Sequence, residues 1–154
     1  MNRINIICLG VRDMAKSLAF YKNIGFNTPE KKEEPQIVFF DNQGTKLELY
    51  PLEELAKDIN ADNPPQIAVG EFCGITFAIN LKSENEVDKF MDNVISHGGT
   101  IAKKPEKVFW GGYSGYFKDP DGYHWEVAYA DVWEFDESNM LLIDKVYDKL
   151  GTDF

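Results

Sequence analysis

Hydrophobic and polar positions follow the same order twice along the chain. Residues 4–26 contain an apolar stretch followed by an amphipathic segment, which begins at Asp13 and ends at Gly25. Residues 74–99 repeat this order, with an S-x-x-E capping box that starts at Ser83. Apolar positions at helical spacing predict a helix in each amphipathic segment, and the capping residues set its ends. Each half therefore starts as a strand followed by a helix.

The segments that follow the two predicted helices also match. Residues 37–50 and 115–129 both contain paired aromatic residues, a turn that closes on glycine, and a strand of alternating apolar and polar positions. In each segment a glutamate, Glu48 or Glu126, comes four residues after the turn glycine. Because such a repeat defines the fold, each half is predicted to be a βαβββ module. The fold class is α+β, with two modules in tandem.

The module boundaries follow from changes in composition. Module 1 covers residues 1–51 and module 2 covers residues 73–130, and together they are expected to form one domain. Residues 52–72 are polar and interrupted by Pro-Pro, which predicts a linker with a short helix. Residues 131–154 carry apolar residues on one helical face, which predicts a C-terminal helical extension: Met140, Ile143, Tyr147 and Leu150.

Charge and composition exclude several classes of function. The 154 residues carry a formal net charge of −10, which argues against binding to nucleic acid or to an anionic membrane. No apolar run reaches the ~20 residues that cross a bilayer, and the start lacks a signal-cleavage pattern, so a cytoplasmic protein is expected. Cys8 and Cys73 have no CxxC spacing, which predicts free buried thiols, or a disulfide if their strands touch.

The duplicated unit and the motif FKDPDGYHWEV resemble the vicinal-oxygen-chelate superfamily, which includes glyoxalase I, bleomycin-resistance proteins and extradiol dioxygenases. The resemblance covers about residues 4–130. VRDMAKSLAFYKNIGF is similar to the first helix motif of the family, and FWGGYSGYFKDPDGYHWEVAY to the last hairpin of a glyoxalase-like subgroup. The resemblance implies two mixed sheets that curl to form a shared cleft.

For the metal-dependent members of that family, the resemblance implies a divalent ion held by side chains from the first and fourth strands of each module. Glu48 and Glu126 occupy the fourth-strand positions, and Ile6 and Thr76 occupy the first-strand positions, where histidine is typical. Isoleucine has no donor atom, and a threonine hydroxyl is a poor substitute for imidazole. His124 can share a face with Glu126 near the rim of the cleft. We therefore expect neither a metal nor a cofactor.

Strand alternation makes Glu126 and Glu48 the candidate catalytic residues. Glu126 lies between Trp125 and Val127, so it should face the cleft while they face the helix layer. If the two carboxylates meet across the cleft, one should hold a proton, and the pair can act as general acid and base. The alternative is that both are solvated strand residues.

The glycine-rich hairpin of residues 110–129 is the candidate wall of a binding site for a planar or ring-bearing molecule. Its ligand-binding candidates are Trp110, Tyr113 and Tyr116, together with Thr76 on the first strand of module 2. Tyr113 and Tyr116 have opposite parity, so both face the cleft only if a β-bulge intervenes. The alternative is aromatic core packing, which is expected for Phe117 and Trp125.

These observations lead to one functional expectation and two alternatives. The protein is expected to bind a small organic molecule without a metal, as a resistance or sequestration protein would. The first alternative is a divalent-metal lyase, isomerase or dioxygenase that uses Glu48 and Glu126. The second is a catalytically silent interaction module. Exposed edge strands and the prevalence of two-fold symmetry predict a homodimer.

Overall fold

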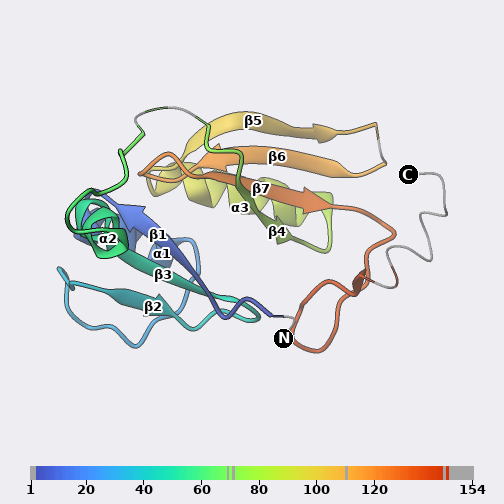
Figure 1. Ribbon diagram of the computed structural model, residues 1–154. Coiled ribbons are helices and arrows are strands. Elements are labelled where there is room, and N and C mark those ends of the chain that lie inside the picture. Colours follow the sequence, from blue (N-terminus) through green and yellow to red (C-terminus); the bar gives the residue numbers. More distant parts are fainter. Residues whose placement is uncertain (1–2, 69, 71, 110, 144, 146–154) are drawn as a thin grey trace. The chain divides into compact units, whose positions relative to one another are not determined.

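The computed structural model consists of two compact units (Figure 1). The first unit comprises Met1–Ile75 together with Asp119–Tyr123, and the second comprises Thr76–Lys118 together with His124–Phe154. The structure describes residues 3–68, 70, 72–109, 111–143 and 145. In these residues no helix has the length and apolar character needed to cross a membrane.

The first unit pairs a three-stranded mixed sheet with two helices. The sheet has the order β1-β3-β2, with β1 parallel and β2 antiparallel to β3. Its elements follow one another along the chain as β1 (Ile6–Val11), α1 (Met14–Asn23), β2 (Val38–Phe40), β3 (Lys46–Pro51) and α2 (Leu52–Ile59). The short helix expected in the linker is therefore α2.

The first unit differs from the predicted repeat, because two strands and not three follow α1. Residues 27–37, where the additional strand would lie, have no regular structure. This segment is highly charged and contains Pro29 and Pro35, which cannot donate to a strand ladder. Thr28 instead donates a hydrogen bond of 2.7 Å from its hydroxyl to the backbone oxygen of Phe39.

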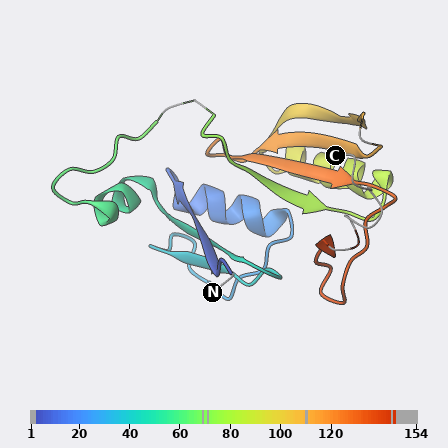
Figure 2. The same ribbon diagram turned by 45° about the vertical axis from the view of Figure 1, so that its right-hand side comes forward.

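The second unit has the predicted βαβββ order (Figure 2). Its sheet has the order β4-β7-β6-β5, with β4 parallel to β7 and the other neighbours antiparallel. Its elements are β4 (Thr76–Asn80), α3 (Glu84–Ser96), β5 (Thr100–Lys107), β6 (Tyr113–Lys118) and β7 (His124–Tyr129). The α+β class predicted from the repeat is confirmed.

Both predicted helix starts are capped as expected. The Asp13 carboxylate accepts from the Lys16 backbone nitrogen at 2.9 Å, and the Ser83 hydroxyl accepts from that of Glu86 at 3.1 Å. The Glu86 carboxylate reaches back to the Lys82 backbone nitrogen at 2.8 Å. The bonds to Lys16 and Glu86 satisfy donors that a helix start leaves without an intrahelical partner, whereas the bond to Lys82 fixes the residue before the N-cap.

Each unit has its own core between one face of its sheet and its long helix. In the first unit, β1, β2, β3 and α1 contribute buried apolar side chains: Leu9, Val11, Leu18, Phe20, Tyr21, Val38, Phe40, Leu47 and Leu49. In the second unit the corresponding side chains come from α3, β6 and β7: Val87, Met91, Val94, Phe117, Trp125 and Val127. The core positions predicted for Phe117 and Trp125 are confirmed.

The turn between β6 and β7 belongs to the first unit, although both strands belong to the second. The Tyr21 hydroxyl donates to the Asp119 carboxylate at 2.5 Å, and the Ser17 hydroxyl donates to the Asp121 carboxylate at 2.6 Å. The Tyr123 hydroxyl donates to the backbone oxygen of Gly10 at 2.9 Å. The conspicuous DPDG turn is therefore a structural element that binds α1 and the end of β1.

The chain after β7 forms turns and an isolated bridge between Phe135 and Leu141. Among the residues predicted to form a C-terminal helix, Met140 lies in this turn region and Ile143 is helical. Tyr147 and Leu150 lie outside the described residues, so the extent of the helix stays a prediction.

Candidate ligand-binding site on the second sheet

Strand register places Glu126 and Tyr116 together on the face of the second sheet opposite α3. They are direct partners across β6 and β7, and Ala78 of β4 is the partner of Glu126 on its other side. Directly paired residues share one face of a sheet. Tyr113 has the opposite parity, and its hydroxyl donates to Asp88 of α3 at 2.8 Å. The structure therefore places Tyr116 beside Glu126 and Tyr113 beside the helix.

A pocket of about 370 Å³ opens on this face, and we call it the Glu126 pocket. It is lined by residues of β5, the loop after β5, β6 and β7: Lys103, Glu106, Lys107, Val108, Phe109, Ser114, Tyr116 and Glu126. Lys103 and Glu106 form an ion pair of 3.1 Å on its β5 side. A volume of this size falls at the lower end of the range of small-molecule sites, which is ~300–1,000 Å³.

Gly115 allows β5 to form a wall of the Glu126 pocket. A β-carbon at this position would lie 2.8 Å from the Pro105 nitrogen and 2.9 Å from the Lys103 oxygen, which is too close for any side chain. The β5–β6 register also shifts between Lys103 and Glu106. The close approach that the glycine-rich sequence suggested is present. The bulge suggested in that sequence is not, because β6 pairs with β7 in regular register and the register shift lies in β5.

Burial and the neighbouring Glu126 determine the protonation of Tyr116. Burial raises the pKa of the Tyr116 hydroxyl, and the charge of Glu126 and a hydrogen bond to it raise that pKa further. Tyr116 therefore remains a neutral phenol at neutral pH and donates to the carboxylate. The pocket therefore presents a carboxylate acceptor that is held in place by a tyrosine.

On the first sheet, Glu48 lies on the face opposite α1 and pairs directly with Cys8 of β1. Burial, followed by a hydrogen bond to Glu48 and the charge of Glu48, raises the pKa of the Cys8 thiol to about 12. The thiol is therefore protonated at neutral pH and is not a nucleophile. Cys8 and Cys73 are both free, as predicted, which leaves no disulfide, but neither is fully buried, because Cys8 is half-buried and Cys73 is exposed.

The remaining predicted site residues are distributed as follows. Thr76 lies on the same face as Glu126 and is the direct partner of His124. Trp110 lies outside the described residues. Ile6 is 44% exposed on the face of the first sheet that also carries Glu48. Whether Glu48 and Glu126 act as a carboxylate pair stays a prediction, because they belong to different units.

The residues around Glu126 on the second sheet offer few of the donor atoms that hold a transition metal tightly. No group of three or more His, Cys, Asp or Glu side chains gathers in residues 3–68, 70, 72–109, 111–143 and 145. The polar neighbours of Glu126 on its sheet are a phenol, a threonine hydroxyl and His124. Zinc and iron sites usually take several histidine, cysteine or carboxylate ligands.

Sequence reasoning missed several residues of the two sheet faces. Ser114 shares the parity of Tyr116, so strand alternation alone could have identified it. Lys103 and Phe109 could not be identified in this way, because the β5 bulge changes the alternation. The contact of Cys8 with Glu48 requires the parallel register of β1 and β3, which no local pattern reveals.

The architecture defines a class of protein built from two related modules, each with a mixed sheet, a covering helix and a glutamate on the last strand. The chain belongs to the Glyoxalase/Bleomycin resistance protein/Dioxygenase superfamily, whose family model matches residues 3–127. The resemblance seen in the sequence motifs is thereby confirmed.

Individual relatives support this assignment. The uncharacterized protein YraH of Bacillus subtilis is 32% identical over 117 residues, covering 75% of this chain and 88% of YraH. The metallothiol transferase FosB of Shouchella clausii is 30% identical over 128 residues, covering 82% of this chain and 80% of FosB. The crystal structure of a glyoxalase-related enzyme from Fulvimarina pelagi has a TM-score of 0.78 and 26% identity, covering 92% of this chain and 98% of that protein.

Proposed function

We propose that this protein binds a small organic molecule in the Glu126 pocket without a resident transition metal. The observation that carries the proposal is the Glu126–Tyr116 pair in a pocket of about 370 Å³. A half-buried carboxylate beside a neutral phenol provides one strong acceptor and one donor at fixed positions. Such a small number of fixed polar groups on a partly apolar wall is typical of small-molecule sites.

The pocket lining indicates which molecules fit. Phe109 and Tyr116 offer ring surface, which favours a planar or ring-bearing molecule. Glu126 favours a hydroxyl or amine donor on that molecule, and the Lys103 ammonium and the Ser114 hydroxyl can donate to an acceptor. We therefore propose a ring-bearing ligand that carries both a donor and an acceptor. Tyr113 is outside this proposed site, because its hydroxyl binds Asp88.

The donor set supports binding without a metal. Ile6 and Thr76 occupy the positions where the metal-dependent family members carry first-strand ligands, and neither side chain is a good ligand for zinc or iron. A carboxylate alone favours hard cations and holds them weakly. No step of the proposed function involves a metal.

Purified protein is expected to contain much less than one zinc, nickel or iron ion per chain, because the histidine ligands of those metals are missing. Inductively coupled plasma mass spectrometry of the untagged protein measures the metal content. A content near one ion per chain, removed by a chelator with a fall in thermal stability, would show that the donor assignment is wrong.

Replacing Glu126 by glutamine is expected to weaken ligand binding at least about tenfold, because a hydrogen bond to a charged acceptor contributes ~1.5–3 kcal/mol. A panel of phenols, aromatic amines and hydroxylated heteroaromatic compounds is first tested for raising the melting temperature of the wild-type protein. Each hit is then titrated by isothermal calorimetry against wild type, Glu126→Gln and the control Glu34→Gln, which changes an exposed loop residue. Equal affinity for wild type and Glu126→Gln would exclude this pocket as the site.

The similarity to the metallothiol transferase FosB favours a second candidate function, that of a metal-dependent thiol transferase. This alternative requires Glu126 as a metal ligand, with other donors replacing Ile6 and Thr76. The metal analysis separates the two candidates. If the bound molecule is released without chemical change, the protein has a sequestration or resistance role. If the molecule is released in a chemically altered form, the protein is an enzyme. Binding of none of the panel would favour the remaining alternative, a catalytically silent interaction module.

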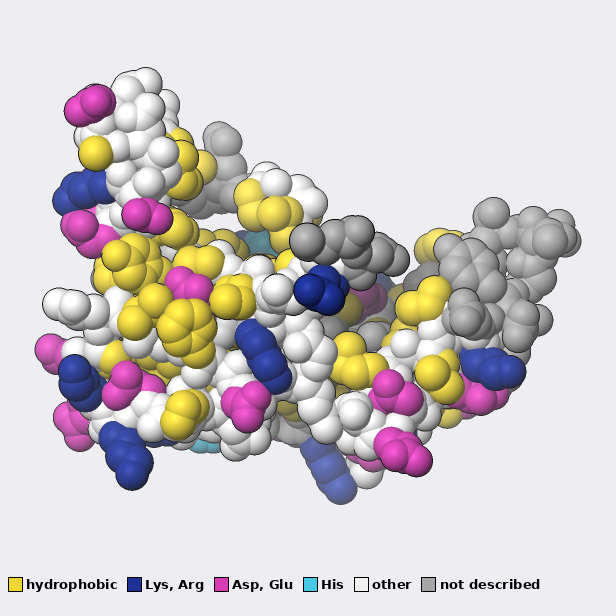
Figure 3. Space-filling model, turned by 60° about the horizontal axis from the view of Figure 1, so that its bottom comes forward, with side chains coloured by type: hydrophobic (Ala, Val, Ile, Leu, Met, Phe, Trp, Pro, Cys, Tyr) yellow, Lys and Arg dark blue, Asp and Glu magenta, His cyan; other side chains and the backbone are white. Residues whose placement is uncertain are grey.

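The protein is expected to form a homodimer in the cytoplasm. The edge strands β1, β2, β4 and β5 leave backbone groups available for pairing. In the first unit the side chain of Ile6 is 44% exposed and that of Phe39, which pairs with Glu48, is 46% exposed. Figure 3 shows hydrophobic side chains gathered in the left-hand part of its view. Multi-angle light scattering at ~10–100 μM should give the dimer mass, since closed two-fold dimers are the commonest assembly. A monomer mass throughout this range would contradict the expectation.

A further inference from the structure

Ser114 places a buried hydroxyl in the wall of the Glu126 pocket. It is 2% exposed, whereas the other polar residues that line this pocket are half-buried or exposed. Within the part of the chain that the structure describes, the Ser114 hydroxyl forms no hydrogen bond. A buried polar group without a protein partner usually bonds to a water molecule or a ligand. The Ser114 hydroxyl is therefore available to a molecule that enters the pocket.

The two lysines that line the Glu126 pocket already have partners. The Lys103 ammonium forms an ion pair of 3.1 Å with Glu106, and the Lys107 ammonium lies 3.8 Å from the Glu84 carboxylate of α3. A ligand that used either ammonium would compete with a carboxylate of the protein. Ser114 has no such competitor, so it is the donor that a ligand can use at the lowest cost.

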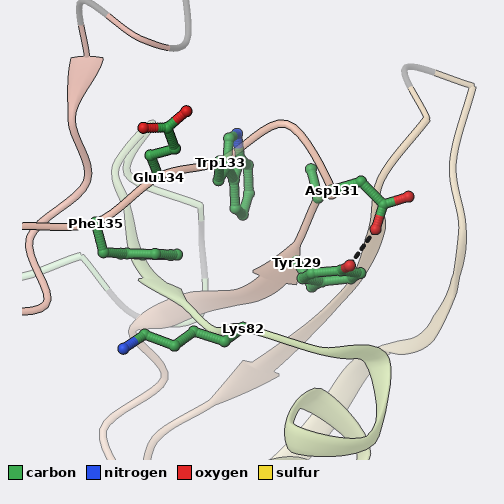
Figure 4. Close-up of a pocket in the computed structure, with 7 residues that line it drawn as sticks. Lys82, Tyr129, Asp131, Trp133, Glu134 and Phe135 are labelled. Carbon is green, nitrogen blue, oxygen red and sulfur yellow. Dashed lines mark hydrogen bonds between the residues drawn. The ribbon is translucent and has the colours of Figure 1, made fainter.

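A second depression in the second unit differs in this respect (Figure 4). It measures about 390 Å³ and is formed mainly by the end of β7 and the residues that follow it. There the Lys82 ammonium donates to the Asn139 side chain at 2.6 Å, and the Tyr129 hydroxyl donates to the Asp131 carboxylate. A polar ligand would have to displace these bonds, whereas the Ser114 hydroxyl has none to lose.

Strand register fixes the separation of Ser114 from Glu126. Ser114 lies two residues before Tyr116 on β6, and Tyr116 is the direct partner of Glu126 on β7. The three side chains therefore share one face of the sheet. Ser114 and Glu126 are diagonal neighbours, which lie ~7–8 Å apart in an antiparallel pair. A single ring with polar groups on opposite carbons suits this separation, whereas polar groups on adjacent carbons are too close together.

The charges around Ser114 disfavour a ligand carboxylate. Glu106 is the direct partner of Ser114 on β5, and Glu126 is its diagonal neighbour on β7, so two carboxylates flank the hydroxyl. The whole chain adds a repulsive potential for anions, with a net charge of −10. Because like charges repel, the ligand atom that accepts from Ser114 should be uncharged, such as a ketone or amide oxygen.

We propose that the Glu126 pocket selects an uncharged molecule with one ring, a hydrogen-bond donor at one end and a neutral acceptor at the opposite end. This inference rests on the proposed binding function of the pocket. Glu126 accepts from the donor of the ligand, the Tyr116 ring contacts the ligand ring, and the Ser114 hydroxyl donates to the acceptor. Glu126 thus anchors any molecule with a donor, and Ser114 determines which of these molecules bind best.

Two phenols of similar size separate these roles. 4-Hydroxyacetophenone has a hydroxyl and a ketone on opposite carbons, and 4-isopropylphenol replaces the ketone oxygen by a methyl group. Both are titrated by NMR against wild type, Ser114→Ala and the control Ser138→Ala, which removes an exposed hydroxyl outside the pocket. Ser114→Ala should weaken binding of the ketone about three- to tenfold, the range for one neutral hydrogen bond, and leave 4-isopropylphenol unchanged. An equal effect on both phenols, or no effect on either, would overturn the proposal.

Two further compounds test the position and the charge of the acceptor on the wild-type protein. 2-Hydroxyacetophenone has its two polar groups on adjacent carbons, and 4-hydroxybenzoate carries a charged acceptor. Each should bind at least about threefold more weakly than 4-hydroxyacetophenone, because the first cannot reach both Ser114 and Glu126 and the second is repelled by two carboxylates. Equal or tighter binding of the first compound would overturn the opposite-end arrangement, and equal or tighter binding of the second would overturn the neutral acceptor.

Two controls separate this inference from the proposed function. Ser114→Ala should not lower the melting temperature of the free protein, because its hydroxyl has no protein partner to lose; a clear fall would show such a partner and would overturn the proposal. Glu126→Gln should weaken binding of both phenols. If neither phenol binds the wild-type protein, the proposed function fails together with this inference. If both bind through Glu126 and Ser114→Ala affects them equally, only the role of Ser114 is wrong.

Discussion

Replacing Trp125 by alanine is expected to lower the free energy of unfolding by about 3–5 kcal/mol, the usual result of truncating a large buried aromatic side chain. Trp125 is 5% exposed and lies on the α3 face of the second sheet. Its ring stacks on that of Phe117, with the ring centroids 6.1 Å apart and an interplanar angle of 5°. Its ring centroid also lies 4.8 Å from that of Phe77. The variant loses both ring contacts and leaves a cavity in the core of the second unit.

Urea denaturation of Trp125→Ala, followed by circular dichroism, measures this change. Its neighbour Glu126→Gln is the matched control, because it lies on the opposite face of the same strand and keeps its volume. The free energy of unfolding of the control is expected to lie within about 0.5 kcal/mol of the wild-type value, as is usual for substitutions at exposed or half-exposed positions. If Glu126→Gln unfolds readily while Trp125→Ala is stable, the assignment of the two faces is wrong.

Replacing Asp119 by alanine is expected to lower the free energy of unfolding by about 2–4 kcal/mol, because it leaves a buried hydroxyl and backbone donors without their acceptor. Asp119 is 4% exposed and Tyr21 is fully buried. One Asp119 oxygen accepts from the Tyr21 hydroxyl at 2.5 Å, and the other accepts from the backbone nitrogens of Asp121 at 3.0 Å and Tyr123 at 2.9 Å. Tyr21→Phe removes one of these bonds and should cost about 1 kcal/mol.

The pH dependence of Asp119 has a defined sign. Burial raises the pKa of the Asp119 carboxyl in the folded protein, and its hydrogen bonds only partly oppose this effect. The folded state therefore binds this proton more tightly than the unfolded state does, so the contribution of Asp119 to stability falls as pH rises through the folded pKa. Asp119→Asn should consequently be more destabilising near pH 4 than near pH ~7. A destabilisation that grows with pH would contradict this reading of the site.

Local patterns were sufficient to predict most of the fold. Capping residues such as Asp13 and Ser83 act within one turn of helix, so their hydrogen bonds could be predicted from the neighbouring residues in the sequence. The face of Glu126 could likewise be predicted, because alternation along a strand is a local property. The prediction of three strands after α1 was wrong because the repeat was followed across a charged segment containing Pro29 and Pro35.

The rest of the candidate site depends on contacts between residues distant in sequence. The placement of Tyr116, and not Tyr113, beside Glu126 follows from the register of β6 and β7. The Cys8–Glu48 pair depends on the parallel register of two strands that are separated by a helix and β2. The bridge between Phe135 and Leu141 is a further contact that no local pattern indicated.

The assignment of Asp119–Tyr123 to the first unit has a consequence for synthesis on the ribosome. The Tyr21 hydroxyl and its acceptor are separated by 98 residues of chain. The first unit is translated first, yet α1 cannot bury this hydroxyl with its partner until the β6–β7 turn has emerged. Domains usually fold in the order of their synthesis. Here the N-terminal unit must remain incomplete until most of the second unit has been made, so nascent chains that stop before Asp119 should be preferred substrates for chaperones and proteases.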